Sequence, residues 1–376
     1  MQKLKKLFVM MMMLSSVFFV ACSDDDDDEM STEQAQAELT NLESDITGYV
    51  EEVQTSDGMT AINALMDVTN EDDPFSDNYK TSAIPNIKKF AVPINLKKLK
   101  SATKENDFNF DDYVGTYTWN TSSRSWDITL GEPSNKIIIK YPTAGISGAT
   151  NNATLTLYSY EEVTITETDD YGTYTYTEPT EISADIYVNS TKVFDIDFSA
   201  TWIASGDAVG EPSNLNVNVS LSPFTLSVTY GFENRTASLN VNFKYDGTSI
   251  IKADLVGAYG SSSMDDTPTN ISGYIQVQNV KVEANVNAQN IENIIDGVDF
   301  DNPNVTEEQL TALVNEQFEA SVSINGKKVG DIVYEFLNFS PGEDESYYDL
   351  LLVFKDGTTM SLSEFLTDLM NSGIPV

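Results

Sequence analysis

From Tyr113 onward, apolar side chains recur at every second position in one segment after another. A period of two buries one face of a strand and leaves the other in solvent, which predicts antiparallel strands. The clearest runs are Leu155/Leu157, Leu215/Val217/Val219/Leu221, Phe224/Leu226/Val228/Tyr230, and Ile275/Val277 followed by Val280/Val282. The pattern indicates a β-dominated α+β fold.

Two-residue turn signals separate many of these strands. They are Asn189-Ser190, Asp246-Gly247, Asn325-Gly326 and Asp356-Gly357. Asn-Gly and Asp-Gly pairs favour the tight turns that connect neighbouring antiparallel strands. We therefore expect the sheet to be built of β-hairpins.

Three hairpins share a shift in the alternation directly after the turn. Before Asn189-Ser190 the apolar residues stand at even positions, Val193 interrupts the series, and even positions then resume. The same step of three follows Asp246-Gly247 and Asn325-Gly326. One extra residue in a strand produces such a shift, and the resulting bulge bends the sheet. Coincidence among many alternating strands is the alternative.

The predicted bulges lie near Phe194-Asp195, Ile251-Lys252 and Gly330-Asp331. Together with the hairpins they predict a long curved antiparallel sheet or a partly open barrel.

Helical patterns precede, interrupt and follow the strands. Ser31 and Gln34 form the ends of a capping box, and apolar residues then recur at steps of three and four. A shorter helical pattern with Ile62, Leu65 and Met66 follows Gly58, so an N-terminal helical segment over 31–70 is expected to form a helical hairpin. The stripe of the first helix comprises Ala35, Leu39, Leu42, Ile46, Tyr49 and Val53.

Two further capping boxes begin at Thr306 and Ser361. The first predicts a helix before the last strands, and the second predicts a short C-terminal helix that ends near Gly373. No long linker interrupts the chain, so residues 31–376 are expected to form a single β-rich domain.

The composition excludes several classes of activity. The chain has no histidine and one cysteine, which excludes Ser-His-Asp and Cys-His catalysis, His-ligated metals, zinc clusters and disulfide frameworks. A net charge of -38 disfavours nucleic acid, because phosphate contacts dominate that affinity. We expect no cofactor, no nucleic-acid partner and no enzymatic activity. A carboxylate-based glycoside hydrolase is a lesser alternative, since the 59 acidic side chains form many close pairs by chance.

The N-terminus has the three parts of a secretory signal. Basic residues come first, an apolar run extends from Leu7 to Phe19, and Val20-Ala21-Cys22 closes the segment. The run is shorter than the about 20 apolar residues that span a bilayer. Cys22 stands where a bacterial lipobox has its lipidated residue, with Phe19 where Leu is usual. We expect a signal peptide over 1–21 and acylation of Cys22, including palmitate, as a membrane anchor.

An acidic run, Asp24 to Glu29, follows Cys22 and Ser23 and predicts a solvated tether over 22–30. A lipobox cysteine followed closely by acidic residues resembles the surface-export signal of Bacteroidota lipoproteins. The resemblance covers residues 1–29 and implies the outer face of the outer membrane. A periplasm-facing lipoprotein with an acidic linker is the alternative.

Aromatic residues provide the candidate binding surface. Tyrosine rings can stack on the apolar faces of sugars, while neighbouring Glu and Thr groups supply hydrogen bonds; cross-strand aromatic pairing is the alternative. The stretch includes Tyr158, Tyr160, Tyr171, Tyr174 and Tyr176, and the candidate ligand-binding residues are Tyr171, Tyr174, Tyr176, Trp119 and Trp126.

The segment Gly115-Thr-Tyr117-Thr-Trp119, followed by Trp126, is similar to the Gly-x-Trp opening of lipocalin-like barrels. Tyr117 takes the place of the family's Trp, and the resemblance covers five residues. It implies a barrel-like fold.

Two charged clusters have both a functional and a structural interpretation. Asp296, Asp299 and Asp301, with Asn304 nearby, could bind a cation, but an EF-hand loop is excluded because Leu310 stands where a bidentate Glu is required. A loop and the first turn of a helix is the simpler interpretation. Seven lysines could form an anion site or pair with surrounding acids: Lys80, Lys88, Lys89, Lys97, Lys98, Lys100 and Lys104.

These features favour a lipid-anchored, surface-exposed binding protein without catalytic activity, with a glycan as the first ligand hypothesis. An apolar-ligand carrier and a structural or adhesive subunit are the alternatives, and the membrane is a partner through the anchor alone.

Overall fold

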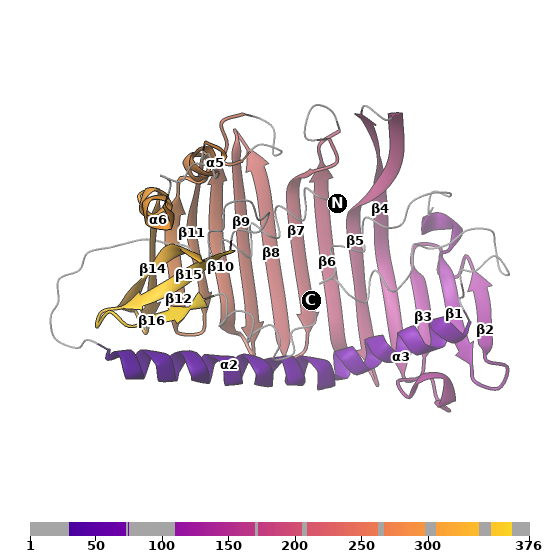
Figure 1. Cartoon of the computed structure of the whole chain (residues 1–376). Helices are drawn as coiled ribbons and strands as arrows, with labels where there is room; N and C mark the ends of the chain where they lie inside the picture. The colour runs from indigo at the N-terminus through magenta and orange to yellow at the C-terminus, as the bar shows by residue number, and fades with distance from the viewer. Residues whose placement is uncertain are drawn as a thin grey trace. The chain divides into compact units, whose positions relative to one another are not determined.

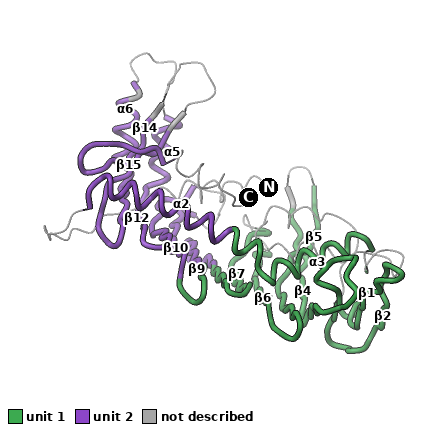
Figure 2. The backbone as a smooth tube through the Cα atoms, turned by 90° about the horizontal axis from the view of Figure 1, so that it is seen from below, with its two compact units in different colours: residues 1, 51–229, 243–248 green, residues 2–50, 230–242, 249–376 purple. Residues whose placement is uncertain are grey.

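The computed structural model describes residues 30–72, 74, 110–169, 172–204, 209–261, 267–297, 306–337 and 347–362. They group into two compact units (Figure 2). The described residues of unit 1 fall within 51–229 and 243–248, and those of unit 2 within 30–50, 230–242 and 249–362. The expectation of a single domain stays a prediction.

The described strands form one open sheet of sixteen (Figure 1), in the order β16-β15-β14-β13-β12-β11-β10-β9-β8-β7-β6-β5-β4-β3-β1-β2. Strands that follow one another in the chain are therefore neighbours in the sheet, except where β3 pairs with β1. That pair is parallel, and every other pair with an assigned register is antiparallel. The predicted long hairpin sheet is confirmed, as an open sheet and not a closed barrel.

The strands of unit 1 are β1 (Gly115–Asn120), β2 (Ser125–Leu130), β3 (Ile137–Tyr141), β4 (Ala153–Asp169), β5 (Gly172–Val188), β6 (Thr191–Trp202) and β7 (Pro212–Leu221). The strands β8 (Phe224–Glu233) and β9 (Thr236–Tyr245) contribute residues to both units. Those of unit 2 are β10 (Thr248–Ala258), β11 (Asn270–Val277), β12 (Val280–Val286), β13 (Phe318–Ile324), β14 (Lys327–Leu337), β15 (Tyr347–Phe354) and β16 (Thr359–Ser361). The first residue of β10, Thr248, belongs to unit 1.

The core of unit 1 lies between one face of its strands and helix α3 (Asp57–Glu71). Ala61, Leu65 and Val68 of α3 are buried, and the helix packs on β3, β5 and β6 (Figure 1). Burial of large apolar side chains at alternate strand positions is the main stabilising contribution, at about 1.5–3 kcal/mol each. Two short 3-10 helices, η2 (Phe110–Asp112) and η3 (Gly145–Ser147), complete this unit.

Helix α2 (Thr32–Thr55) begins at the predicted capping box. The Ser31 backbone N–H donates to Gln34 Oε1 at 3.0 Å, and the Gln34 N–H donates to Ser31 Oγ at 3.3 Å. The predicted helical hairpin is wrong: Ser56 alone separates α2 from α3, whereas an αα-hairpin needs a loop of about 2–5 residues. Ser56 instead caps α3 by accepting a hydrogen bond from the Met59 N–H.

Two of the three predicted bulges are confirmed, each one residue before the expected pair. Ile186 pairs with Phe194 and Tyr187 with Lys192, which leaves Val193 as the extra residue of β6. In β14, Val329 is the extra residue in the same way. Both extra residues are buried, because the residue that breaks the alternation turns into the core.

The third bulge, expected near Ile251-Lys252 in the β9–β10 hairpin, stays a prediction. The surroundings of this third position match those of the bulge at Val193. Ile250 is buried, and its carbonyl accepts a hydrogen bond from the Gln278 N–H at 2.6 Å, as the Val193 carbonyl does from the Ser222 N–H at 3.2 Å.

Unit 2 contains helices α5 (Ala288–Asp296) and α6 (Glu307–Asn315). The predicted capping box at Thr306 is confirmed, and Leu310 and Val314 of α6 are buried, with the partly buried Ile291 of α5 packed against them. Residues 32–50 of α2 contact the turn of the β11–β12 hairpin in this unit: Glu38 accepts from the Asn279 amide, and Asp45 from the Gln278 amide. Of the predicted C-terminal helix, Leu362 is the last described residue.

Candidate functional site

The strands of unit 1 have one apolar and one polar face. Residues paired directly across antiparallel strands point to the same side, so the registers define both faces. The apolar face packs on α3. The opposite face, which we call the polar face, comprises Thr116, Thr118, Asp127, Thr129, Lys140, Thr154, Thr156, Ser183, Asp185, Tyr187, Asp195, Asp197, Asn216, Asn218 and Ser220, with Ile138 as an apolar exception.

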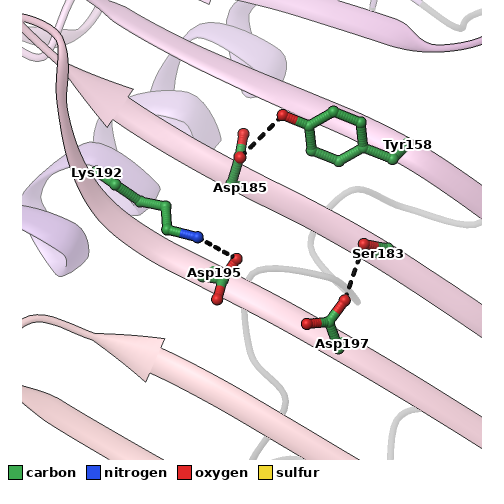
Figure 3. A network of polar contacts seen from close by, with 6 residues as sticks. All are labelled: Tyr158, Ser183, Asp185, Lys192, Asp195 and Asp197. Carbon is green, nitrogen blue, oxygen red and sulfur yellow. Dashed lines mark hydrogen bonds and ion pairs between the residues drawn. The ribbon is translucent and has the colours of Figure 1, made fainter.

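Tyr158 reaches this face because β4 carries a bulge. Leu157 pairs with Ala184 and Ser159 with Ser183, so Tyr158 is the extra residue between them. Its hydroxyl donates to Asp185 Oδ2 at 2.9 Å (Figure 3), while the side chain itself is 44% exposed. The bulge thus places an exposed aromatic ring beside a carboxylate that belongs to the next strand.

Asp185 is the unusual residue of the polar face. It stands in β5 between Thr156 of β4 and Asp195 of β6, and it is only 6% exposed. Its second oxygen, Oδ1, is buried and has no hydrogen-bond partner among the described residues. Buried carboxylate oxygens without partners are rare in folded proteins and call for an explanation, such as a water, an ion or a ligand group.

The neighbouring carboxylates each use one oxygen within the sheet. Lys192 Nζ lies 2.8 Å from Asp195 Oδ1, and Ser183 Oγ donates to Asp197 Oδ1 at 2.9 Å (Figure 3). The Lys192 and Asp195 side chains are 45% and 34% exposed, so solvent screens the ion pair and it contributes little stability. Ser159, which pairs with Ser183, has a buried hydroxyl that also lacks a partner in the described part of the chain.

Burial raises the pKa of Asp185 above its usual value of 3.8, and the adjacent Asp195 raises it further. The hydrogen bond from Tyr158 and the positive charges of Lys192 and Lys136 act in the opposite direction. Burial and the Asp185 carboxylate also raise the pKa of Tyr158. Lys136 contacts the same ring, with its Nζ 5.8 Å from the ring centroid.

The predicted ligand residues lie in different surroundings. Trp119 and Trp126 are buried at 2% and 4% exposure and meet edge to face in the core, with ring centroids 5.2 Å apart. The structure therefore does not bring them to the same surface as the tyrosines.

Among the predicted tyrosines, Tyr174 is 46% exposed and lies opposite Glu167. Tyr176 is half-buried, and burial, followed by the charges of Glu167 and Glu178, raises its pKa to about 12. Tyr171 lies outside the described residues.

Of the predicted cation cluster, only Asp296 is described, at the exposed end of α5. Asp299, Asp301 and Asn304 lie outside the described residues, as do Cys22 and the seven lysines of 80–104. Within the described ranges, no group of three or more Asp, Glu, Cys or His side chains is arranged to hold a metal ion.

Sequence reasoning missed Asp185 and its neighbours. The signal was present: Ser183, Asp185 and Tyr187 occupy the polar positions of a strand whose other positions are Ile182, Ala184 and Ile186. Periodicity places Asp185 on the solvent side, and only the tertiary structure shows that it is nearly inaccessible there.

The comparisons add no relative: no family model, no curated protein and no solved structure matches the chain. In the part of the chain that the structure covers, no helix has both the length and the apolar character needed to cross a membrane.

Proposed function

We propose that this protein is a lipid-anchored, surface-exposed binding protein without catalytic activity, and that the polar face around Asp185 binds a glycan. The observation that carries the proposal is the buried Asp185 Oδ1, which has no donor in the described part of the chain although it lies beside an exposed aromatic ring. A hydroxyl of a bound sugar would supply the missing donor. A hydrogen bond to a carboxylate is also stronger than one between neutral groups.

The rest of the polar face supports this assignment. Tyr158 and Tyr187 are 44% and 38% exposed, and both lie on the side of the sheet that carries Asp185. Exposed aromatic rings offer flat apolar surfaces, and Ser183, Asp195 and Asp197 add hydroxyl and carboxylate groups next to them. An aromatic surface bordered by oriented acceptors is suited to a sugar ring, which has one apolar face and polar edges.

A binding titration tests the assignment. The purified protein, kept in detergent, is titrated with a panel of oligosaccharides by calorimetry. Tyr158→Ala and Tyr187→Ala are expected to weaken binding about tenfold each, since removal of an aromatic contact costs about 1 kcal/mol or more. Tyr174→Ala is the matched control because Tyr174 is equally exposed but lies on the distal part of the β4–β5 hairpin.

Unchanged binding in the Tyr158 and Tyr187 variants, together with a loss in Tyr174→Ala, would move the glycan site to the distal hairpin. Binding of fatty acids in place of sugars would favour the apolar-ligand carrier. Hydrolysis of an oligosaccharide during the titration would contradict the non-catalytic assignment.

The anchor is tested separately. Cys22→Ala is expected to abolish incorporation of labelled palmitate and to release the protein from the membrane fraction, because Cys22 is the only cysteine of the chain. Digestion of intact cells with an added protease then distinguishes the faces of the outer membrane. A surface protein is degraded, whereas a periplasm-facing one is protected.

A further inference from the structure

We propose that the glycan bound at the polar face carries a free primary amine, as in a deacetylated amino sugar, and that its ammonium group binds Asp185 Oδ1. The inference rests on the proposed glycan function and names the class of sugar.

The charges of the site favour a cation. The six residues of the network contain three carboxylates, Asp185, Asp195 and Asp197, and one ammonium, that of Lys192 (Figure 3). Lys136 beside Tyr158 adds a second ammonium, so the carboxylates remain in excess. Sulfated sugars and uronic acids would bring further negative charge to this surface and to a chain of net charge -38. Sialic acids are disfavoured in the same way.

The unpartnered oxygen also favours an ammonium over a hydroxyl. Asp185 Oδ1, when ionised, only accepts hydrogen bonds, and a buried ionised carboxylate is costly unless it is paired with a charge. An ammonium group supplies three donors and a full positive charge, whereas a hydroxyl supplies one neutral donor. A cationic ligand group therefore relieves both the missing hydrogen bond and the buried charge.

The aromatic ring beside Asp185 already interacts with a cation. Lys136 Nζ lies 5.8 Å from the centroid of Tyr158, within the range of cation–π attraction. A ring and a carboxylate that meet at one point are a combination that recognises ammonium groups, and Tyr158 OH holds the two together through its 2.9 Å hydrogen bond to Asp185.

Lys192 occupies the adjacent carboxylate in the free protein. Its ion pair with Asp195 is exposed, so a ligand ammonium can compete with it at small cost. Asp185 Oδ1 is buried in the free protein, so binding requires neighbouring side chains to move. Exposed side chains such as Tyr158 and Lys192 rotate on the picosecond to nanosecond timescale.

The test compares three ligands of equal length by calorimetry on the purified protein: glucosamine oligomers, N-acetylglucosamine oligomers and glucose oligomers. The glucosamine oligomer is expected to bind at least about tenfold more tightly than the other two. Asp185→Asn is expected to remove this preference.

Lys192→Gln is a second variant, and it is expected to strengthen binding of the glucosamine oligomer severalfold by removing the competing cation. Asp127→Asn is the control because it makes the same change of charge on the same face but in β2, with the three strands β4, β3 and β1 between it and Asp185. An equal loss in Asp185→Asn and Asp127→Asn would mean unspecific attraction to an acidic protein and would overturn the inference.

The other outcomes separate the inference from the proposed function. Equal binding of all three oligomers overturns the amine preference and leaves glycan binding intact. No binding of any oligosaccharide overturns both. Oligolysine that binds as tightly as the glucosamine oligomer, and loses that binding in Asp185→Asn, would make the ligand a basic peptide and overturn the amino-sugar assignment.

Discussion

Gly58, in the first turn of α3, lies against the backbone carbonyl of Val193, the bulged residue of β6. A Cβ at position 58 would come within 2.7 Å of that oxygen and within 2.3 Å of Leu221 Cδ1. The bulge turns the Val193 side chain into the core, and its carbonyl accepts a hydrogen bond from Ser222 close to the helix. The missing side chain of Gly58 therefore allows helix and bulged hairpin to approach closely.

Gly58→Ala is expected to destabilise the protein by about 1–3 kcal/mol, because the added methyl group overpacks this contact. Gly48→Ala is the matched control: Gly48 is an exposed interior residue of α2, and outside the local helix backbone no described atom lies within 4 Å of its ideal Cβ position. It should gain up to about 1 kcal/mol from helix propensity. Urea denaturation measures both. A gain in stability for Gly58→Ala would contradict the close approach.

Gly273→Ala is expected to cost about 3 kcal/mol or more, since both backbone conformation and space exclude a side chain. Gly273 has a φ of +139°, and its Cβ would lie 1.9 Å from the carbonyl oxygen of Asp254 on β10. Gly231→Ala, in β8, should change stability by no more than about 0.5 kcal/mol, because its nearest neighbour is the Ser238 hydroxyl at 3.3 Å. Similar midpoints for the two variants in thermal denaturation would contradict the β10–β11 register.

Trp126→Phe is expected to destabilise the protein by about 1–3 kcal/mol more than Trp119→Phe. The two rings are equally buried neighbours, but Trp126 Nε1 donates to the Asp72 carbonyl at 2.8 Å, whereas Trp119 Nε1 is buried and finds no partner among the described residues. Phenylalanine removes a hydrogen bond at one position and an unsatisfied donor at the other. The order of the two denaturation midpoints in urea tests this, and the reverse order would contradict the assigned partners.

Asp185→Asn is expected to stabilise the protein by about 1 kcal/mol at pH 7. The pKa of Asp185 is raised in the folded state, so the folded state binds the proton more tightly than the unfolded one. Wild-type stability therefore falls as the pH rises from the unfolded pKa, near 3.8, through the higher folded pKa, and the deficit is constant above it. The variant has no such loss, so its advantage should vanish below about pH 3.8.

Melting temperatures of wild type and Asp185→Asn between pH 3 and pH 8 measure this difference. Asp197→Asn is the control. The Asp197 carboxylate accepts a hydrogen bond from Ser183, so its replacement should lower the stability of the protein. An advantage of Asp185→Asn that grows toward low pH would reverse the sign and contradict the raised pKa of a buried Asp185.

Local patterns were sufficient to predict much of the fold. The capping boxes at Ser31 and Thr306 are present because they depend on residues three positions apart. The bulges at Val193 and Val329 were visible because one extra residue moves every later side chain to the other face of the strand. The prediction of a helical hairpin was wrong because a single residue, Ser56, separates α2 from α3. The sequence pattern near Gly58 did not define that boundary.

The amino-acid sequence by itself determined the alternating strands, their turns and the polar side of each strand, because these depend on the period of the side chains along the backbone. Only the tertiary structure decided that Trp119 and Trp126 lie in the core and that Asp185 is buried beside Tyr158. Burial depends on which neighbouring strands and bulges cover a residue, and those neighbours come from pairings between segments distant in the chain. The unpaired oxygen of Asp185 is therefore a property of the folded sheet and not of strand β5 alone.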